Sequence, residues 1–270
     1  MVKQRLDTLL VDLGLSPSRQ QAQRLIQAGE VMVNQQVIDK AGTEIDITAQ
    51  IQVKEHPPFV SRGGEKLAKA LEFFGISVTR RICLDGGIST GGFTDCLLQA
   101  GAIQVYGIDV GYGQVDWKIR TDERVILKER TNLRQLQPEE LYPENATSPD
   151  LAVVDVSFIS LTKVLPAVWR LTQFPKEAVL LVKPQFEVGK NRVGKKGVVR
   201  NAKDHAEAIL QVLKTALELG WKYKGLTWSP ITGPAGNIEY LLWLGMESET
   251  ISLPLDTVEE MTKSAVADFR

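Results

Sequence analysis

Hydrophobic and polar positions follow two different patterns, one on each side of the adjacent prolines Pro57 and Pro58. Before the prolines, apolar residues recur at helical spacing from Arg5 to Leu15, and a second helix is indicated between Ser18, which can cap it, and Gly29, which can end it. Short alternating runs follow at 31–37, 45–48 and 51–53. This order predicts a small α+β domain over residues 1–56.

After the prolines, apolar runs of strand length alternate with stretches of helical periodicity. The predicted strands are 82–85, 104–109, 124–128, 151–156, 178–183, 222–228 and 239–244, and the predicted helices are 64–74, 92–100, 160–173 and 202–219. Alternation of this kind is typical of a doubly wound, mostly parallel sheet. We therefore expect a Rossmann-like α/β domain of about seven strands over residues 64–270, joined to the first domain by a linker at 57–63.

Composition narrows the class of protein without identifying a partner. The 270 residues are 43% apolar, enough for a globular core, and the formal net charge of −1 neither requires nor excludes binding to a nucleic acid. Acidic residues interrupt the first apolar run, which argues against a signal peptide or a membrane span. Cys83 and Cys96 lack metal-ligand spacing, so we expect core residues, no metal and a reducing, cytoplasmic location.

The segment RICLDGGISTGGF, residues 81–93, places a glycine-rich turn after the first strand of the α/β domain. Its glycines lack the G-x-G-x-x-G spacing of a dinucleotide site, which argues against a nicotinamide dehydrogenase. The acid Asp85 would repel a pyrophosphate but attract a cationic ligand such as S-adenosylmethionine. Asp109 ends the next strand, where its carboxylate could accept the two hydroxyl hydrogens of a ribose.

Four more charged residues stand where a buried position is expected. Lys183 ends the strand in LLVKPQFE, and Asp155 ends the strand before it, so their side chains could meet above the sheet. Lys66 follows two glycines at the start of a helix, and Glu239 enters an apolar strand, where an unpaired acid is costly.

Six motifs in order, SRGGEKL, STGGFTDCLL, ERTNLR, DVSFISL, LVKPQFE and GNIEY, resemble the TlyA family of ribosomal RNA 2′-O-methyltransferases, which are related to the FtsJ methyltransferases and are also called haemolysin-like. The resemblance implies a catalytic set of Lys66, Asp155, Lys183 and Glu239. It implies S-adenosylmethionine as the cofactor, held by Asp85, Gly87, Ser89, Thr90, Gly91, Asp109 and Asn132. Ile88 departs from the family, in which a small residue is usual at that position.

RNA is the expected partner. Residues 3–55 resemble the S4 RNA-binding domain, and between Lys183 and Lys203 seven Lys and Arg residues face one acid, Glu187, with little periodicity, as in a mobile basic loop. Ribosomal RNA or ribosomal subunits would be the substrate, with cytidine suggested by the family. The residues expected to contact RNA are Arg19, Arg24, Arg62, Lys190, Arg192, Lys195 and Lys196.

Two questions stay open at this point. Lys183 could act as the general base toward a ribose 2′-hydroxyl, or as an ammonium group that orients the hydroxyl and stabilises its developing charge. The alternatives to an enzyme are an RNA-binding protein with a decayed methyltransferase fold, and a membrane-lytic protein of the kind that the older family name suggests.

Overall fold

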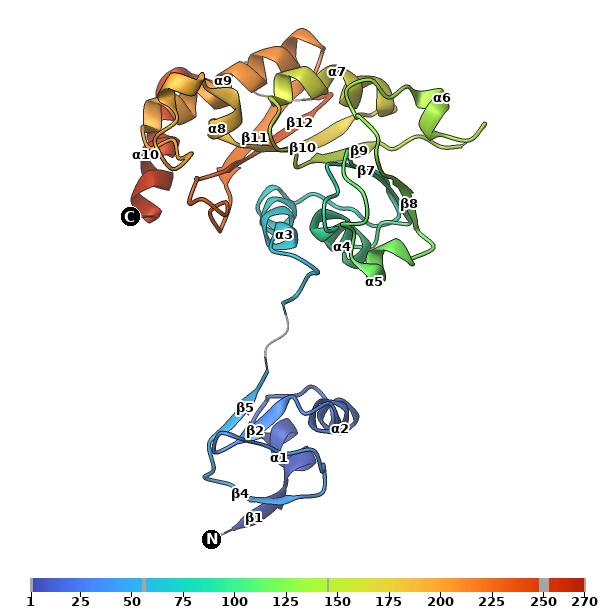
Figure 1. Ribbon diagram of the computed structural model, residues 1–270, viewed down its shortest axis with the longest axis vertical. Coiled ribbons are helices and arrows are strands. Elements are labelled where there is room, and N and C mark those ends of the chain that lie inside the picture. Colours follow the sequence, from blue (N-terminus) through green and yellow to red (C-terminus); the bar gives the residue numbers. More distant parts are fainter. Residues whose placement is uncertain (1, 55–56, 145, 248–252, 270) are drawn as a thin grey trace. The chain divides into compact units, whose positions relative to one another are not determined.

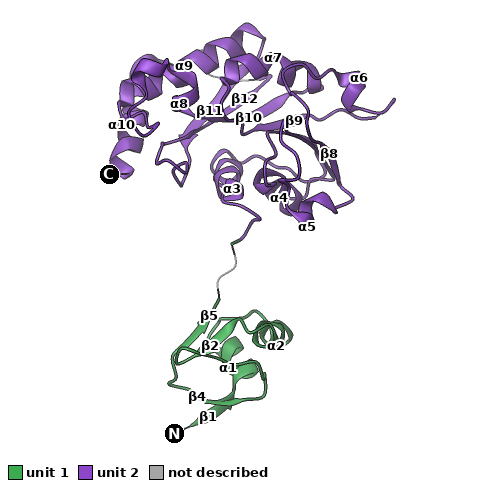
Figure 2. Ribbon diagram, in the orientation of Figure 1, with its two compact units in different colours: residues 1–57 green, residues 58–270 purple. Residues whose placement is uncertain are grey.

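The computed structural model describes residues 2–54, 57–144, 146–247 and 253–269, and the chain divides into two compact units, residues 1–57 and 58–270 (Figure 2). Residues 58–62, which we had placed in the linker, belong to the second unit. The Val60 amide donates to the Asp95 carboxylate at 2.9 Å, and Gln99 donates to the Pro58 carbonyl at 2.9 Å. The expected linker over 57–63 is therefore too long at its C-terminal end, because this stretch hydrogen-bonds to the helix that contains Asp95.

The described residues of the first unit form two helices and five short strands. Ser18 caps the second helix by accepting from the Gln21 amide at 3.2 Å. β1 pairs antiparallel with β4, and β2 lies between β3 and β5. Leu6, Leu10, Ala22 and Ile26 lie in its core. The elements are β1 (Lys3–Arg5), α1 (Leu6–Asp12), α2 (Arg19–Gln27), β2 (Val31–Val33), β3 (Gln36–Val37), β4 (Glu44–Asp46) and β5 (Ile51–Val53).

A buried carboxylate ties the two helices of this unit together. Asp7 has an exposed fraction of 0% and accepts hydrogen bonds from Arg5, from Arg19 at 3.0 Å and from Gln23 at 2.8 Å. The hydrogen bonds from Arg5, above all, hold the pKa of Asp7 well below its ordinary value. Arg19, which we expected to contact phosphate, pairs with Asp7 although its side chain is 56% exposed, and Arg24 is exposed as well.

Asp7→Asn should lower the stability of the first unit at neutral pH by about 2 kcal/mol, because hydrogen bonds to a charged group are lost. A lowered folded-state pKa contributes stability above the ordinary value near 3.8 that disappears as the pH falls. The unsubstituted protein should therefore lose its greater stability over Asp7→Asn as the pH falls below about 4. Hydrogen exchange of α1 and α2 amides at about pH 2 and at pH 7 measures the effect, and equal protection in both proteins at pH 7 would contradict it.

The second unit is built on a seven-stranded sheet with the order β11-β12-β10-β9-β6-β7-β8. β6 to β10 are parallel, and β12 runs antiparallel to both of its neighbours. The strands are β6 (Ile82–Gly86), β7 (Gln104–Ile108), β8 (Val125–Lys128), β9 (Leu151–Val154), β10 (Glu177–Val182), β11 (Lys222–Trp228) and β12 (Tyr240–Gly245). All seven predicted strands are confirmed, with ends that differ by at most two residues.

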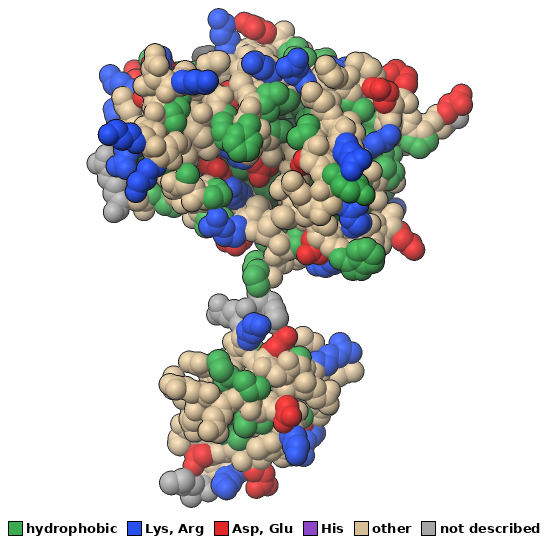
Figure 3. Space-filling view, in the orientation of Figure 1, with side chains coloured by type: hydrophobic (Ala, Val, Ile, Leu, Met, Phe, Trp, Pro, Cys, Tyr) green, Lys and Arg blue, Asp and Glu red, His purple; other side chains and the backbone are tan. Residues whose placement is uncertain are grey.

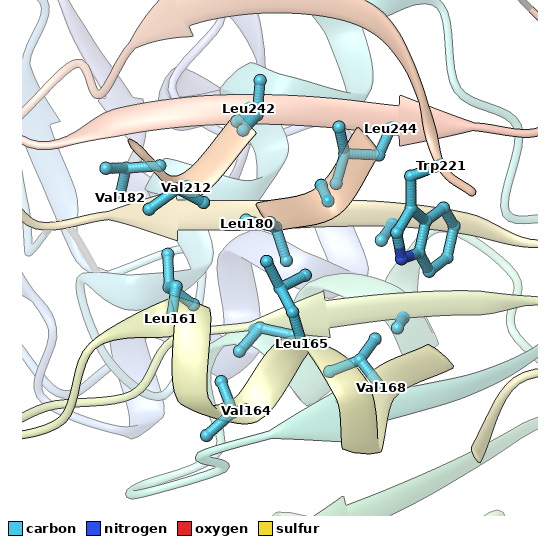
Figure 4. Packing of buried hydrophobic residues seen from close by; sticks show 14 of the residues in the cluster. Leu161, Val164, Leu165, Val168, Leu180, Val182, Val212, Trp221, Leu242 and Leu244 are labelled. Carbon is cyan, nitrogen blue, oxygen red and sulfur yellow. The ribbon is translucent and has the colours of Figure 1, made fainter. Parts of the chain in front are cut away.

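Helices cover both faces of this sheet (Figure 1). Residues of α3 and α4 pack in one core cluster, and residues of α7, α9 and α10 pack in another. Figure 4 shows Leu161, Leu165 and Val168 of α7 beside Leu180 of β10. The helices are α3 (Gly63–Phe74), α4 (Gly92–Gln99), α5 (Trp117–Arg120), α6 (Pro138–Leu141), α7 (Leu161–Leu171), α8 (Pro184–Glu187), α9 (Ala202–Glu218) and α10 (Leu255–Asp268), with a 3-10 turn, η1 (Lys190–Arg192). The sequence pattern did not indicate α10.

Strand direction determines which side chains reach the ligand-binding edge of the sheet. β6 lies between β7 and β9, so the strand order reverses there, and ligands of such sheets bind outside the carboxyl ends of the strands at this point. Because β12 is antiparallel, its first residue Tyr240 pairs with Val182, the last residue of β10. Glu239, which precedes β12, and Lys183, which follows β10, therefore lie at the same edge.

Candidate active site

The four predicted catalytic residues form two ion pairs. Lys183 Nζ lies 2.6 Å from Asp155 Oδ1 and also donates to Ser157 Oγ at 2.8 Å. Lys66 Nζ lies 2.5 Å from Glu239 Oε2, and the exposed fractions of these two side chains are 10% and 2%. Both lysines therefore hold partners that compensate for their removal from water.

Tight packing of glycines brings the start of α3 to the glycine turn. A side chain at Gly92 would collide with Ser61 Oγ, and one at Gly64 would collide with the ring of Phe59. A Cβ at Gly92 would also lie 2.9 Å from the Gly64 amide nitrogen, so the glycine at position 92 allows the first turn of α3, which carries Lys66, to approach the first turn of α4. Lys66 consequently lines one cavity together with Gly87 and Asp155, although these residues are far apart in the sequence.

Two cavities meet at Gly87, Ser89 and Asp155. The smaller, of about 190 Å³, is bordered by Lys66 and by Arg62. The larger, of about 480 Å³, extends to Asp109 and Asn132. Among the predicted cofactor residues, the structure thus places Gly87, Ser89, Asp109 and Asn132 around the larger cavity, and Thr90 at the smaller one.

The glycine turn has a shape that only glycine permits at Gly87. Its φ is +92°, and a Cβ there would collide with the carbonyl oxygen of Asp155. Asp109 fixes the far side of the turn, since it accepts from the Ser89 amide at 2.8 Å and from the Gly111 amide at 2.7 Å. Ile88 is buried against Gly107, which has no Cβ, so the larger side chain is accommodated in the core.

Asp85, at the end of β6, and Gly91, directly before α4, border neither cavity. Asp85 is fully buried, its Oδ2 accepts from Thr94 Oγ1 at 2.7 Å, and its Oδ1 has no hydrogen-bond partner. Burial raises the pKa of Asp85 to about 7, and the neighbouring carboxylates Asp155 and Asp109 add to the rise. An added cation above the turn would favour its ionised form.

Asp85→Asn should stabilise the protein at pH 8 and have little effect near pH 4. The pKa of Asp85 is raised from 3.8 to about 7 in the folded protein, so the folded state is favoured at low pH, where the carboxyl is protonated. This contribution to the free energy of unfolding is lost as the pH rises through 7, and it amounts to up to about 4 kcal/mol. The amide keeps an acceptor for Thr94 but cannot ionise. Urea unfolding at pH 5 and pH 8 tests this, with the exposed Glu218→Gln as the control. An advantage for the variant that does not grow with pH would refute the assignment.

The residues predicted to contact RNA fall into two groups in the second unit. Arg62 borders the smaller cavity, beside Lys66. Lys190, Lys195 and Lys196 are exposed, and Figure 3 shows Lys and Arg side chains gathered on the side of this unit where α8 and α10 lie. Arg192 is different, because it pairs with Asp204 at 3.2 Å and with Glu207. The segment is also more regular than expected, since it contains η1 and a hydrogen-bonded turn.

Sequence reasoning missed two residues at the site, Ser157 and Phe158, and the structural role of Glu187 nearby in the sequence. Ser157 is a second partner of Lys183. Phe158 is 92% exposed, has a φ of +63°, lines the larger cavity and lies 5.2 Å from the Phe186 ring. Glu187 entered the sequence analysis only as the one acid of the basic segment. It is buried, and its carboxylate accepts hydrogen bonds from Ser160 Oγ at 2.5 Å and from the Leu161 amide at 2.8 Å. Burial raises the pKa of Glu187. All three stand inside the motifs DVSFISL and LVKPQFE, which were the available signal.

The described residues show neither of two other features that were considered. Within ranges 2–54, 57–144, 146–247 and 253–269, no helix is both long and apolar enough to cross a membrane. No three His, Cys, Asp or Glu side chains of these ranges are grouped so that they could hold a metal ion.

Comparisons with known proteins agree with this geometry. The FtsJ-like methyltransferase model matches residues 59–246, and the S4 domain model matches residues 4–51.

Two relatives match nearly the full length of the chain. One is "16S/23S rRNA (cytidine-2'-O)-methyltransferase TlyA" of Mycobacterium tuberculosis, which is 45% identical over 98% of this chain and 97% of its own length. The other is "Putative rRNA methyltransferase YqxC" of Bacillus subtilis, which is 46% identical over 97% of this chain and 94% of its own length. A solved structure, "Putative hemolysin from Streptococcus thermophilus", has a TM-score of 0.74 and 40% identity, and covers 100% of this chain and 98% of its own. The chain therefore belongs to the FtsJ-like methyltransferase family and carries an S4 domain before its catalytic domain.

Proposed function

We propose that the protein transfers a methyl group from S-adenosylmethionine to a ribose 2′-hydroxyl of ribosomal RNA. Two ion pairs carry the proposal: the buried pair of Lys66 with Glu239, and the pair of Lys183 with Asp155, whose carboxylate lies where the two cavities meet. The relatives whose names specify rRNA cytidine-2′-O-methylation, and the S4 domain, support the substrate class. By the same relationship, cytidine is the proposed nucleotide.

The larger cavity fits a nucleoside cofactor. Asp109 borders it with a carboxylate that two backbone amides already hold in place, so a ribose would meet a fixed acceptor. Asn132 borders the same cavity and would face the adenine end. The Oδ1 of Asp85 has no hydrogen-bond partner, and a cationic group near it would compensate for the buried carboxylate. When bound, the cofactor supplies an electrophilic methyl group on a cationic sulfur.

Lys183 would hold the attacking hydroxyl. An ammonium group has three N–H donors. Ser157 accepts one of them and Asp155 Oδ1 is an ion-pair partner at 2.6 Å, so a donor remains for the ribose oxygen. As the oxygen forms its bond to the methyl carbon and the carbon–sulfur bond breaks, the hydroxyl proton departs to water. The charge of Lys183 stabilises the oxygen during that step. Lys66, fixed by Glu239, adds a second positive charge at the smaller cavity.

Exposed groups around the cavities are suited to a flipped nucleotide. Phe158 presents its ring to solvent at the rim of the larger cavity, and aromatic rings of this kind stack on unpaired bases. Arg62 at the smaller cavity can meet a phosphate. The exposed Arg24 of the S4 domain would add a sequence-independent contact.

Transfer of a radiolabelled methyl group from S-adenosylmethionine to isolated ribosomal subunits tests the proposal. We expect label in RNA, at one or a few nucleotides that resist alkaline cleavage, because a 2′-O-methyl group removes the attacking hydroxyl. A synthetic fragment with 2′-deoxyribose at the mapped nucleotide should accept no label. Label on a base, or no label with either subunit, would overturn the proposal.

A further inference from the structure

The basic segment after α8 contains a tight turn with the sequence Gly-Lys-Lys-Gly, residues 194–197. The Gly197 amide donates to the Gly194 carbonyl at 2.8 Å, and the Gly194 amide donates to the Val198 carbonyl at 3.0 Å. Gly197 has a φ of +77°, which closes the turn. Lys195 and Lys196 occupy the two middle positions and are exposed, so the turn presents two adjacent ammonium groups to solvent.

A second turn of the same form, Gly-Pro-Ala-Gly at 233–236, lies at the active site. The Gly236 amide donates to the Gly233 carbonyl at 2.8 Å, and the Gly233 amide donates to the Asn237 carbonyl at 2.8 Å. Pro234 borders the smaller cavity. A Cβ on Gly233 would lie 2.5 Å from Glu239 Oε1, so this turn passes directly over the catalytic carboxylate.

Asn237 joins the two turns. Its side chain donates to the Gly197 carbonyl at 2.9 Å and accepts from the Val199 amide at 3.0 Å. It is 3% exposed, and both of its polar atoms are used. An asparagine side chain carries an NH₂ donor and an oxygen acceptor close together. It can therefore bind the Gly197 carbonyl and the Val199 amide at the same time.

The carbonyl of Val199 is held from the other side. His205 Nε2 lies 2.9 Å from the Val199 carbonyl oxygen, and His205 Nδ1 lies 2.7 Å from the Tyr240 hydroxyl. Because a carbonyl can only accept, Nε2 carries the hydrogen and the tyrosine donates to Nδ1. Tyr240 follows Glu239 directly. The residues at the end of the Gly-Lys-Lys-Gly turn are thus connected to the segment around Glu239 in two ways, through Asn237 and through His205 with Tyr240.

We propose that Asn237 is a positioning residue for RNA, which fixes the Lys195–Lys196 turn in register with the turn over Glu239. This inference rests on the proposed function. Phosphate contacts set the register of a nucleic acid on a protein, and the Gly-x-x-Gly loops of KH domains clamp an RNA backbone. A phosphate held by the two lysines would therefore place the ribose at a defined distance from the ion pairs.

A double-mutant cycle in the full-length protein tests this assignment. Asn237→Ala should raise KM for the RNA about tenfold, leave cofactor Kd within about twofold, and reduce the salt dependence of RNA binding. In a Lys195→Ala/Lys196→Ala background the same change should have almost no further effect on KM, because the lysines it positions are gone. The proposal would be overturned if the effects of Asn237→Ala and of the double lysine substitution on KM for RNA were additive. It would also be overturned if Asn237→Ala lowered the cofactor affinity and left KM for RNA unchanged.

A second variant avoids the buried site. Gly197→Ala strains the turn through its positive φ, yet a Cβ there meets open space, so the core is untouched. It should raise KM for RNA, whereas Gly75→Ala, with a φ of +67° and equally open surroundings at the end of α3, should not. Equal effects of the two alanines would count against the turn.

Hydrogen exchange separates failure of this inference from failure of the proposed function. The Val199 amide should lose protection in Asn237→Ala whether or not the protein methylates RNA. Direct binding of a ribosomal RNA fragment provides the affinity without turnover. Unchanged protection at Val199 would refute the anchoring itself, and unchanged RNA affinity with lost protection would refute its role in binding.

Discussion

Lys183→Ala is expected to lower the methyl-transfer rate constant by about 10³-fold, the usual effect of removing a group that stabilises charge in a transition state. The reason is that Lys183 is held by its ion pair with Asp155 at 2.6 Å and by its hydrogen bond to Ser157 at 2.8 Å, and it keeps a donor for the substrate oxygen. It borders neither cavity, so cofactor affinity should stay within about twofold of the parent. Single-turnover methyl transfer and a direct titration of the cofactor measure the two quantities.

Two further variants make this result specific. Lys183→Arg keeps a positive charge but cannot serve as a proton acceptor, so partial activity there favours the electrostatic role over the general-base role. Lys214→Ala removes an exposed lysine of α9 and should leave turnover unchanged. If Lys183→Ala retained most of its turnover, its assignment to the reaction would be wrong.

The second large effect concerns the buried pair of Lys66 and Glu239. Lys66→Met should destabilise the protein by about 3–5 kcal/mol, because it leaves a 2% exposed carboxylate without its partner. Lys66→Met combined with Glu239→Leu should recover much of that stability, since two apolar groups of similar volume replace two charges. Methyl transfer should nevertheless be lost in both variants, by at least about 10²-fold.

Denaturant unfolding and methyl transfer measured on the same preparations would show whether stability and activity separate in this way. A double variant that is both stable and active would mean that the pair has only a structural role. A double variant no more stable than Lys66→Met would instead show that the site cannot accept apolar side chains, and it would contradict the predicted recovery.

Much of the fold was predictable because each element carries its own pattern. The inner strands of the second unit, such as β9 and β10, are continuous apolar runs, as expected for strands covered by helices on both faces, and the ends of all seven strands were found to within two residues. α10 was missed because Val258, Thr262 and Ala265 are its buried residues, which make only a weak apolar stripe. The end of the linker was misplaced because the hydrogen bond from Val60 to Asp95 joins residues 35 positions apart.

The sequence allowed us to predict which residues belong to the candidate site, but not which of them form ion pairs or hydrogen bonds with one another. Motif spacing could name Lys66 and Glu239 as unusual charges, but their contact depends on an antiparallel β12 and on glycine packing at the start of α3. Asp85 was expected to meet the cofactor, and the sequence could not show that its Oδ2 accepts from Thr94 while its Oδ1 has no hydrogen-bond partner. Arg19 was expected on a free polar face, and the buried Asp7 that engages it lies 12 positions away.

The most direct test is a crystal structure of the protein with S-adenosylhomocysteine. The adenosine should occupy the larger cavity with its ribose on Asp109, and its sulfur should lie near Gly87, facing Asp155 and the two lysines. A cofactor bound elsewhere, or one whose sulfur faces away from both ion pairs, would show that these four charged residues do not surround the transferred methyl group.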